Sequence, residues 1–579
     1  MANKNRLELY LAAVLPELRR AAAPVAGLGA PWILFFSVSD GASRAKVMTV
    51  RGDSLDAAWQ AGVAEIRDLV KRQKLDVRWL RVDHVEAIEA MTWSVLRQRL
   101  ASTKRNYFRF GISLDAACRK AFLENELNSN VMLYMGGDVA ECVPNEKLFL
   151  AYAKRRHGLD ALDFSDDAPV WLFSARGIFV GEDLKAHALQ GAGVDMGPRP
   201  NLDKIILPMD SAGRRVIEKL TLADVESLIA SSTCYLAGEI KEDGQFNYGW
   251  FPCFHRPVRS YNALRHASSL YATLEGWEVI RGNTGGDAIK AALERGLAYL
   301  TQNLIRRMTL PSGKPAAFLV DVGDQIKLGG NAVSILALVK YTELTGDQQF
   351  LPLLNELGEG ILRMQNPETG GFVHVLHYPS LEVKDAFRTI YYDGEATFGL
   401  MRLYGLTRNP RWIDAAERAL AWFIEKQHWK AHDHWLSYCV NEITKYRPER
   451  KYFEFGIRNF NGHLNFVSER ITTYPTLLEL MMAAEQMVSR LKNDPANADL
   501  LQQVDIDKFY HALEKRAHYM LNGYFWPELA MFYSKPSTIV GSFFIRHHSF
   551  RVRIDDVEHY LSGYVAYRKY LLQQSKNRP

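Results

Sequence analysis

A recurrence of paired helical segments, from about residue 220 to the C-terminus, constrains the fold more than any other feature of this chain. Runs with apolar residues at helical spacing alternate with short turn-forming stretches, and a new pair begins about every 60–70 residues. The predicted helices span residues 221–239, 260–279, 287–306, 329–345, 349–365, 393–407, 411–427, 470–491, 506–522 and 555–574. Because stacked helix pairs bury a continuous core, this spacing indicates a curved or closed helical array.

Every second predicted helix opens with small and polar residues. These openings contain Asn262, Gly329, Asp393, Thr472 and Asp555. The start of a helix carries backbone N–H groups without an intrahelical partner and the positive end of the helix dipole. If these helices line the inside of a closed ring, their first turns meet at one mouth. The sequence therefore predicts a polar site at that mouth.

Length and composition limit the other possibilities. A chain of 579 residues exceeds what one ordinary core supports, so two or three domains are expected. The hydrophobic fraction of 47% and the charged fraction of 24% are ordinary for a globular protein. The net charge of +5 is spread along the chain without a Lys/Arg run, so no nucleic-acid partner is expected.

No motif for a cofactor, a metal or a membrane is found. The five cysteines are far apart, without C-x-x-C spacing, and H-E-x-x-H, G-x-G-x-x-G and phosphate-loop patterns are missing. The sequence therefore predicts no cofactor and no metal. The apolar stretch 9–15 runs directly into charged residues, which favours an amphipathic helix over a secretory signal. No apolar run is long enough for a membrane span, so a cytoplasmic protein is predicted.

The first 200 residues alternate strand-like and helix-like stretches. Strands are predicted at 32–38, 45–50, 77–82, 107–112 and 170–180, an extended piece at 131–135, and helices at 54–72, 85–100 and 116–126. A sheet with helices on one face suits this order. We predict an α+β domain over residues 1–200 and an all-α domain over residues 215–579, joined near the Gly- and Pro-rich stretch 191–200. The role of the first domain is open, and docking of a protein partner is one option.

Several turn motifs resemble those of a known superfamily. The matching stretches are 242–246, 365–372 and 392–396, each of which has a polar residue followed by glycine, and two of which run on to phenylalanine. They look like the α/α-toroid proteins, also called six-hairpin glycosidase-like proteins, which include glucoamylases, unsaturated uronyl hydrolases and N-acylglucosamine 2-epimerases. The resemblance covers about 360 residues and implies an α/α toroid with short β hairpins at its mouth. The D-x-D-D signature of the cyclases and the Cys/His/Cys zinc set of the lanthionine cyclases are missing.

Two groups of residues are candidates for acid-base catalysis. Asp393 and Glu395 flank a glycine at a predicted helix start, and Asp556 and His559 lie three residues apart on one helical face. Each group has a structural alternative. Asp393 can cap its helix, and the second group can form an ion-pair network that closes the ring.

The remaining candidates would bind substrate. They are Asn262, Arg265, His266, Arg388, Tyr392, His463, Glu469, Arg470, Arg551, Arg553 and Asp555. Arginines bind carboxylates through two parallel N–H groups, so Arg265, Arg470 and Arg553 are predicted to hold an acidic substituent such as a uronate. Residues 543–553 are predicted as a strand, in which the adjacent His547 and His548 would point to opposite sides and could not share a metal.

Taken together, these residues predict a carbohydrate-active enzyme that hydrolyses or epimerises a glycan at the mouth of the toroid. The main alternative is a non-catalytic glycan-binding or scaffolding component of a surface-polysaccharide assembly system. A modifying enzyme for peptides or lipids in the same cavity is a third reading, which no cofactor motif supports.

Overall fold

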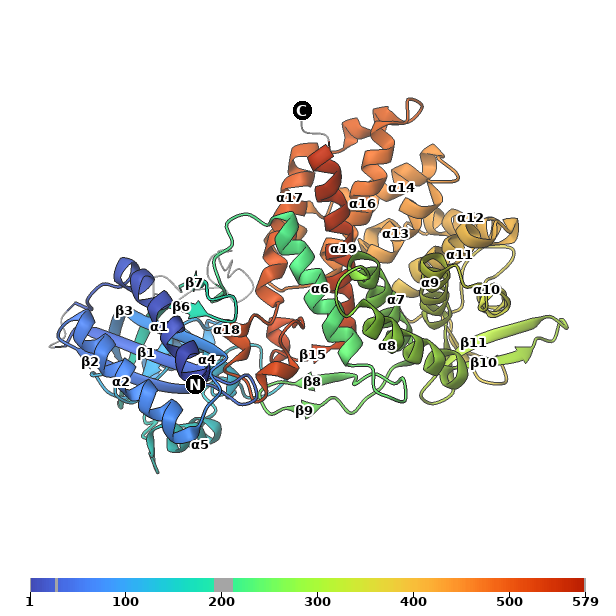
Figure 1. Ribbon diagram of the computed structural model, residues 1–579. Helices are drawn as coiled ribbons and strands as arrows, with labels where there is room; N and C mark the ends of the chain where they lie inside the picture. The colour runs from blue at the N-terminus through green and yellow to red at the C-terminus, as the bar shows by residue number, and fades with distance from the viewer. Residues whose placement is uncertain (1, 27–29, 192–211, 577–579) are drawn as a thin grey trace.

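A computed structural model describes residues 2–26, 30–191 and 212–576. It shows an N-terminal α+β region followed by a larger helical region, drawn in blue and in green to red in Figure 1. The predicted multidomain fold, an α+β part followed by an α/α toroid, is therefore confirmed. The predicted joint at 191–200 lies, apart from Gly191, outside the described residues, and the domain boundary stays a prediction.

The N-terminal region is built on one antiparallel sheet. Its strands run in the order β2-β1-β3-β6-β4-β5, with β7 also paired to β6. Their bounds are Trp32–Ser39 for β1, Lys46–Gly52 for β2, Trp79–Thr92 for β3, Gly111–Ser113 for β4, Ala121–Phe122 for β5, Pro169–Val180 for β6 and Ala186–Ala188 for β7. The predicted hairpin at 32–50 is the β1–β2 pair.

Alternation along β1 assigns the two faces of this sheet. Leu34 and Phe36 pack under helices α1 (Ala2–Ala21) and α2 (Leu55–Gln73), whereas Phe35 belongs to the buried cluster on the other face. That second cluster also contains Met531 and Phe532 of the helical region. One face is thus covered by local helices, and the other packs against the rest of the molecule.

Two helix predictions in this region are wrong. Residues 85–92 continue β3, and only α3 (Trp93–Ala101) is helical within the predicted stretch 85–100. Residues 116–120 are not helical, and α4 (Glu124–Ser129) starts later, followed by α5 (Glu146–His157). The Ala- and Glu-rich stretch 85–92 is extended because β6 pairs with it, so tertiary pairing overrides helix propensity. The extended piece predicted at 131–135 is a turn and coil.

The helical region closes into a ring. The inner helices are α7 (Ala263–Ile280), α9 (Leu328–Thr345), α11 (Tyr391–Thr407), α13 (His434–Ile443), α16 (Thr476–Lys492) and α19 (Ile554–Lys576). Each contacts the next in this order, and α19 contacts α7. The contacts therefore form a closed circle, and α11 lies opposite α19 in it.

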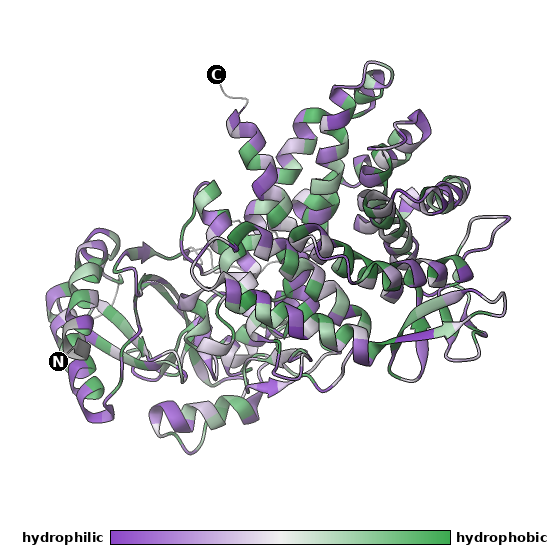
Figure 2. Ribbon diagram, turned by 45° about the vertical axis from the view of Figure 1, so that its right-hand side comes forward, coloured by the Kyte–Doolittle hydropathy of each residue, from purple (hydrophilic) through white to green (hydrophobic). Residues whose placement is uncertain are grey.

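A second layer of helices surrounds the ring. The outer helices are α6 (Leu222–Gly238), α8 (Gly286–Tyr299), α10 (Leu351–Met364), α12 (Pro410–Glu425), α14 (Arg450–Asn461) and α17 (Ile506–Tyr519). They alternate with the inner helices along the chain, and each packs on an inner helix. Figure 2 shows hydrophobic and hydrophilic residues alternating around these helices, as expected for helices with one buried face.

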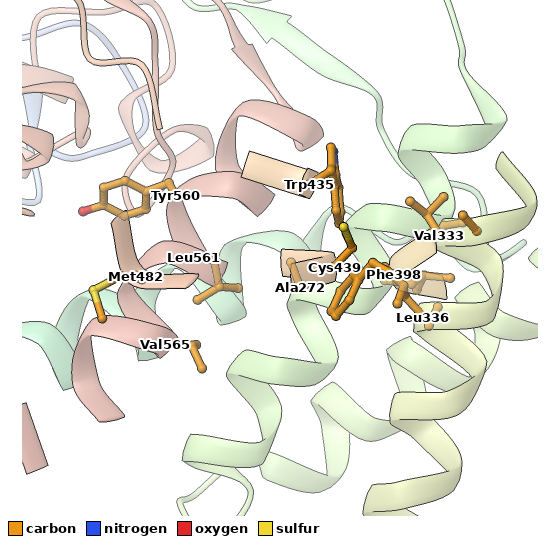
Figure 3. Close-up of a cluster of buried hydrophobic side chains, with 14 of the residues drawn as sticks. Ala272, Val333, Leu336, Phe398, Trp435, Cys439, Met482, Tyr560, Leu561 and Val565 are labelled. Atoms are coloured by element: carbon orange, nitrogen blue, oxygen red, sulfur yellow. The ribbon is translucent and has the colours of Figure 1, made fainter. Parts of the chain in front are cut away.

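The axis of the ring is filled by side chains. Figure 3 labels buried residues contributed by every inner helix, among them Ala272, Leu336, Phe398, Cys439 and Met482. Residues 328–342 of α9 are all buried, as expected for a helix surrounded by other helices. The middle of the toroid is therefore a packed core.

Short strands and helices lie at the end of the toroid where the inner helices begin. The strands are β8 (Gly249–Phe251), β9 (Arg256–Pro257), β10 (Ile305–Thr309), β11 (Pro315–Asp321), β12 (Gln325–Lys327), β13 (Val375–His377), β14 (Val383–Asp385) and β15 (Val552–Arg553). They form the sheets β10-β11-β12-β13-β14 and β15-β8-β9. The short helices are α15 (Leu464–Glu469) and α18 (Pro527–Ala530). The predicted β hairpins at the mouth are thus present.

The structure adds a helix pair that the periodicity did not predict. Residues 434–443, which lie between two predicted helices, form α13, and α14 follows. In addition, α16 begins at Thr476 rather than at 470, and residues 543–553 contain a 3-10 turn at 546–548 and only the short β15. Among the described helices, none is both long enough and apolar enough to cross a bilayer.

Candidate active site

A cavity of about 360 Å³ lies where the inner helices begin. Its lining comes from the first turns of α7, α11, α13, α16 and α19. The polar and aromatic members of this lining are Asn262, Arg265, Ser268, Thr389, Tyr391, Tyr392, Glu395, His434, Trp435, Tyr474, Thr476, His548, Arg553, Asp555, Asp556, Glu558 and His559. Segments almost 300 residues apart in sequence therefore share one site, at the positive ends of the helix dipoles.

Glu395, in the first turns of α11, is a buried acid that forms no ion pair with any residue in the described ranges. Its Oε2 is buried and has no hydrogen-bond partner among the described residues. Burial, reinforced by the nearby Asp433 carboxylate, raises the pKa of Glu395 to about 8. The carboxyl group lies against Gly329 of α9, where any Cβ would overlap its oxygen. At neutral pH this side chain therefore holds a proton.

The start of α19 carries a network of two aspartates and two arginines. Asp555 Oδ2 lies 2.8 Å from Nε of Arg265 and 3.1 Å from Nη2 of Arg553. Arg553 also donates to both oxygens of Asp556, at 3.1 and 3.3 Å. Burial, together with the adjacent Asp555 carboxylate, raises the pKa of Asp556 even though Arg553 opposes the shift. Both arginines are therefore paired with protein carboxylates.

Glu558 and His559 of α19 are further polar residues in the cavity lining. Glu558 Oε2 accepts from the hydroxyl groups of Ser268 and Ser269 on α7, at 2.6 and 2.9 Å. Burial raises the pKa of Glu558 to about 8. For His559, burial favours the neutral form, but Glu479, whose Oε2 lies 2.7 Å from Nδ1, outweighs it and raises the pKa to about 10. His559 is thus an imidazolium held by a carboxylate of α16.

His434, the first residue of α13, completes the wall. Its Nδ1 lies 3.1 Å from Oδ2 of Asp433, and Asp433 Oδ1 caps the helix by accepting from the N–H of Leu436. His434, Glu479 and His559 each offer a ligand atom, and these atoms lie within 4.8 Å of one another. Within the described chain, this group has the composition needed to bind a metal ion.

Aromatic rings form the rest of the wall and its rim. Trp435, Tyr391, Tyr392 and Tyr474 line the cavity, and Tyr391 and Tyr474 are 41% and 37% exposed. Rings with one exposed face beside polar groups suit the apolar faces of a sugar. A larger hollow of about 830 Å³ lies elsewhere, between residues 131–134 and 251–259, but no carboxyl group is in its described lining.

The cavity brings together many of the predicted site residues. Those in its lining are Glu395, Asp556, His559, Asn262, Arg265, Tyr392, Arg553 and Asp555. Asn262 has a structural task as well, because its side chain caps α7 by accepting from the N–H of Arg265.

Asp393, one of the predicted catalytic residues, lies behind the wall. Its Oδ2 is 3.0 Å from Nε2 of His374, and both side chains are almost fully buried. Nδ1 of His374 accepts from the N–H groups of Arg388 and Thr389, so Nε2 carries the proton that is donated to Asp393. Through its hydrogen bond with His374, Asp393 therefore holds the segment before α11 against the first turn of that helix.

The other predicted binding residues also lie outside the lining. His266 is fully buried between Tyr261 and the carbonyl of Gly296, and Arg551 contacts His548 behind the rim. The remaining ones are Arg388, which pairs with Asp385; His463, which stacks on His432; Glu469, which is exposed; and Arg470, which is exposed and donates to Thr472.

His434, Glu479 and Glu558 are ionisable residues at or beside the cavity that were not among the predicted site residues. His434 was missed because its helix was not predicted, and Glu479 because α16 was started six residues too early. Glu558 stands beside the predicted His559 but was not named. For His434, the one local signal in the sequence is Asp433, a good N-cap residue directly before it.

Comparisons with known proteins give likeness in structure only. No family model matches the sequence, and no curated protein matches it. Solved structures that resemble the chain include a D-mannose isomerase (11% identity, TM-score 0.43, covering 62% of this chain and all of that one). A cellobiose 2-epimerase from Spirochaeta thermophila has 12% identity and a TM-score of 0.44, with 61% of this chain and 98% of that one covered. An α-1,6-mannanase from a Salegentibacter species has 10% identity and a TM-score of 0.41, with 60% and 100% covered.

The fold itself is established by the contacts between helices. The inner helices close on themselves, an outer helix packs on each, and short strands lie at the end where the inner helices begin. The region from α6 to α19 is therefore an α/α toroid.

Proposed function

We propose that the chain is a carbohydrate-active enzyme that hydrolyses or epimerises a glycan by proton transfer in this cavity. Both reactions need one group that gives up a proton and another that accepts one, within reach of the same sugar ring. One observation carries the proposal: Glu395 on α11, which holds a proton at neutral pH, and Asp556 on α19 face one cavity from opposite sides of the ring.

The proposed roles follow from the surroundings of the two acids. Glu395 has a pKa of about 8, so its carboxyl group can donate a proton to a leaving or ring oxygen at neutral pH. Asp556 is held in one orientation by Arg553, and its raised pKa makes its carboxylate a better proton acceptor. Asp393 contacts His374 and positions α11 in this proposal.

The charges of the wall favour a neutral or amino-bearing sugar over the uronate expected from the sequence. Arg265 and Arg553 are already paired with Asp555 and Asp556, and Arg470 lies outside the described lining. A substrate carboxylate would have to displace one of these pairs. The hydroxyl groups of a neutral sugar can instead bond to the carboxylates, while Trp435 and Tyr392 contact its faces.

The test is product analysis in deuterium oxide. The full chain is incubated with a panel of neutral and amino-bearing oligosaccharides and reducing sugars, and the products are identified by NMR and mass spectrometry. Epimerisation through a carbanion places solvent deuterium on carbon, whereas hydrolysis produces new reducing ends without carbon-bound deuterium. Binding to a glycan array without either product would support the scaffolding alternative and contradict the enzyme.

The Glu395→Gln variant tests the assigned acid. Glutamine imitates the protonated carboxyl group in shape and charge but cannot give up a proton. We expect at least a 100-fold loss of kcat, an unchanged Kd for the sugar and a melting temperature within a few degrees of the wild type. The wild-type kcat/KM should fall as the pH rises through about 8, because the donor is lost there. Glu368→Gln, at an exposed position, is the matched control; equal activity of the two variants would remove Glu395 from the mechanism.

A further inference from the structure

A group of three metal-ligating residues lies at the edge of the cavity, on consecutive inner helices. His434 begins α13, Glu479 lies in the first turn of α16, and His559 lies in the second turn of α19. One ligand atom from each lies within 4.8 Å of the others. Two imidazole nitrogens and one carboxylate oxygen are a common ligand set of catalytic zinc sites, which leave the fourth position to water or substrate. His434 and His559 both line the cavity, so that position would face it.

His434 is oriented as a metal-binding histidine is. Its Nδ1 faces the Asp433 carboxylate, so this nitrogen carries the proton and Nε2 has a free lone pair. Nε2 is buried and has no partner among the described residues, and the side chain is only 4% exposed. A buried acceptor left without a partner is costly, and the carboxylate behind it is the usual outer partner of a metal-bound imidazole.

Glu479 and His559 are held in place from outside the cluster. Glu479 Oε1 accepts from the hydroxyl group of Tyr438, at 3.1 Å, which leaves Oε2 for the cluster. Oε2 shares a proton with His559 Nδ1 at 2.7 Å. A metal ion bound between these atoms would replace that proton, which passes to the solvent, so binding releases one proton and no oxidant or reductant is needed.

We propose that His434, Glu479 and His559 bind one divalent transition-metal ion, of which Zn²⁺ best matches two imidazoles and a carboxylate. Asp433 and Tyr438 are the positioning residues of this site, since each bonds to a ligand without reaching the ion. The proposal does not depend on the sugar chemistry above, because metal binding is measured without a substrate.

Metal titration of the stripped full chain tests the site. After dialysis against a chelator, Co²⁺ is added and followed by its visible absorption, and Zn²⁺ is added in a calorimeter in two buffers with different ionisation enthalpies. We expect one equivalent of each metal to bind, with the strong absorption of four-coordinate Co²⁺ and release of about one proton. The absence of saturable binding by the folded protein would overturn the proposal.

Variants separate this site from other histidines. His434→Gln and Glu479→Gln should each weaken Zn²⁺ binding by more than about 100-fold, and Asp433→Asn, which keeps the helix cap, by about 10–100-fold. His463→Gln, in the stacked His432–His463 pair outside the lining, is the matched control and should bind Zn²⁺ as the wild type does. Circular dichroism checks that each variant is folded. Binding that survives both ligand variants, or is lost in the control, would place the metal elsewhere and reject the site.

Discussion

Glu395 illustrates how a single residue depends on its immediate neighbours. Its carboxyl group is placed in a pocket that an ordinary helix residue would fill, since Gly329 of the adjacent helix has no side chain. Burial then keeps the proton on the acid at neutral pH. The protonation and position of Glu395 on α11 therefore depend on α9 as well. A substitution at Gly329 of α9 should change both.

The substitution Gly329→Ala tests this dependence. The new Cβ would lie 1.7 Å from Oε2 of Glu395 and 2.8 Å from Cδ1 of the Tyr392 ring, so both side chains must shift. We expect the free energy of unfolding to fall by about 1–3 kcal/mol, as for other overpacked buried sites, and turnover to fall at least tenfold. Gly238→Ala is the control, since its Cβ would meet no atom within 4 Å. Full activity of Gly329→Ala would show that the position of the Glu395 carboxyl group is unimportant.

A second buried acid, Glu239, gives a pH-dependent prediction away from the cavity. It follows the last turn of α6, and its Oε2 accepts from the indole N–H of Trp250 at 3.2 Å. Burial raises its pKa from 4.5 to about 7. The folded state thus favours the protonated form, so the contribution of Glu239 to stability is complete below about pH 4.5 and is lost as the pH rises through about 7.

Glu239→Gln removes the ionisation and keeps a hydrogen-bond acceptor for Trp250. At pH 8 we expect a higher free energy of unfolding, by about 1–3 kcal/mol, and almost no difference near pH 4.5. Denaturant titrations at the two pH values measure it. Glu242→Gln is the control, because the Glu242 side chain is 97% exposed. A pH-independent effect would contradict the assigned burial of the charge.

At the scale of elements, α11 depends on a contact with the hairpin that precedes it. His374 follows the turn after α10, and its two ring nitrogens bond to Asp393 and to the backbone at residues 388–389. The imidazole thus joins a loop and the first turn of the helix. Since α11 presents Glu395 to the cavity, this contact positions the proposed acid.

Removal of the contact should lower stability. Asp393→Ala leaves the Nε2–H of a buried histidine without an acceptor, at a cost of about 1–3 kcal/mol, whereas Asp393→Asn keeps an acceptor and should cost less. Urea unfolding of both variants is the measurement. Asp414→Ala, at an exposed position of α12, should change the free energy of unfolding by less than about 0.5 kcal/mol. If Asp393→Ala matched this control, the fastening role would be refuted.

For the whole molecule, buried and half-buried arginines form contacts between the sheet and the toroid. Arg44, in the β1–β2 turn, donates to the carbonyl groups of Cys253 and Phe532 at 2.7 and 2.6 Å. Glu528 of α18 is fully buried and binds Arg215 through two parallel contacts of 2.9 and 2.8 Å, while its carbonyl accepts from Arg81 of β3. The described parts of the two regions are therefore expected to unfold together.

Glu528→Ala tests this coupling. It leaves the half-buried Arg215 guanidinium without its counter-ion, which costs about 2–3 kcal/mol, less than for a fully buried charge. We expect the single calorimetric transition of the wild type to separate into two. Glu454→Ala, which breaks the exposed pair with Arg450, is the control and should leave one transition. A wild-type protein that already unfolds in two steps would contradict the coupling.

Local patterns predicted those parts of the fold that depend on neighbours in sequence. The β1–β2 hairpin and the bounds of α6, α9 and α12 follow from periodicity and caps to within a few residues. The prediction failed at 85–92, where β6 holds an Ala- and Glu-rich stretch extended. It failed again at α13, whose Trp, Tyr and Cys residues have little helix propensity but pack inside the ring.

By itself, the sequence determined the repeating helix pairs, the α+β start of the chain and the polar residues at helix starts. Each of these features depends on residues that are close together in the chain. Only the tertiary structure decided which of those polar residues share a cavity. It placed His434 and Glu479 beside His559 and moved Asp393 behind the wall. The physical reason is that packing between segments tens to hundreds of residues apart sets the order of the helices in the ring and the rotation of each helix. No local sequence pattern contains that information.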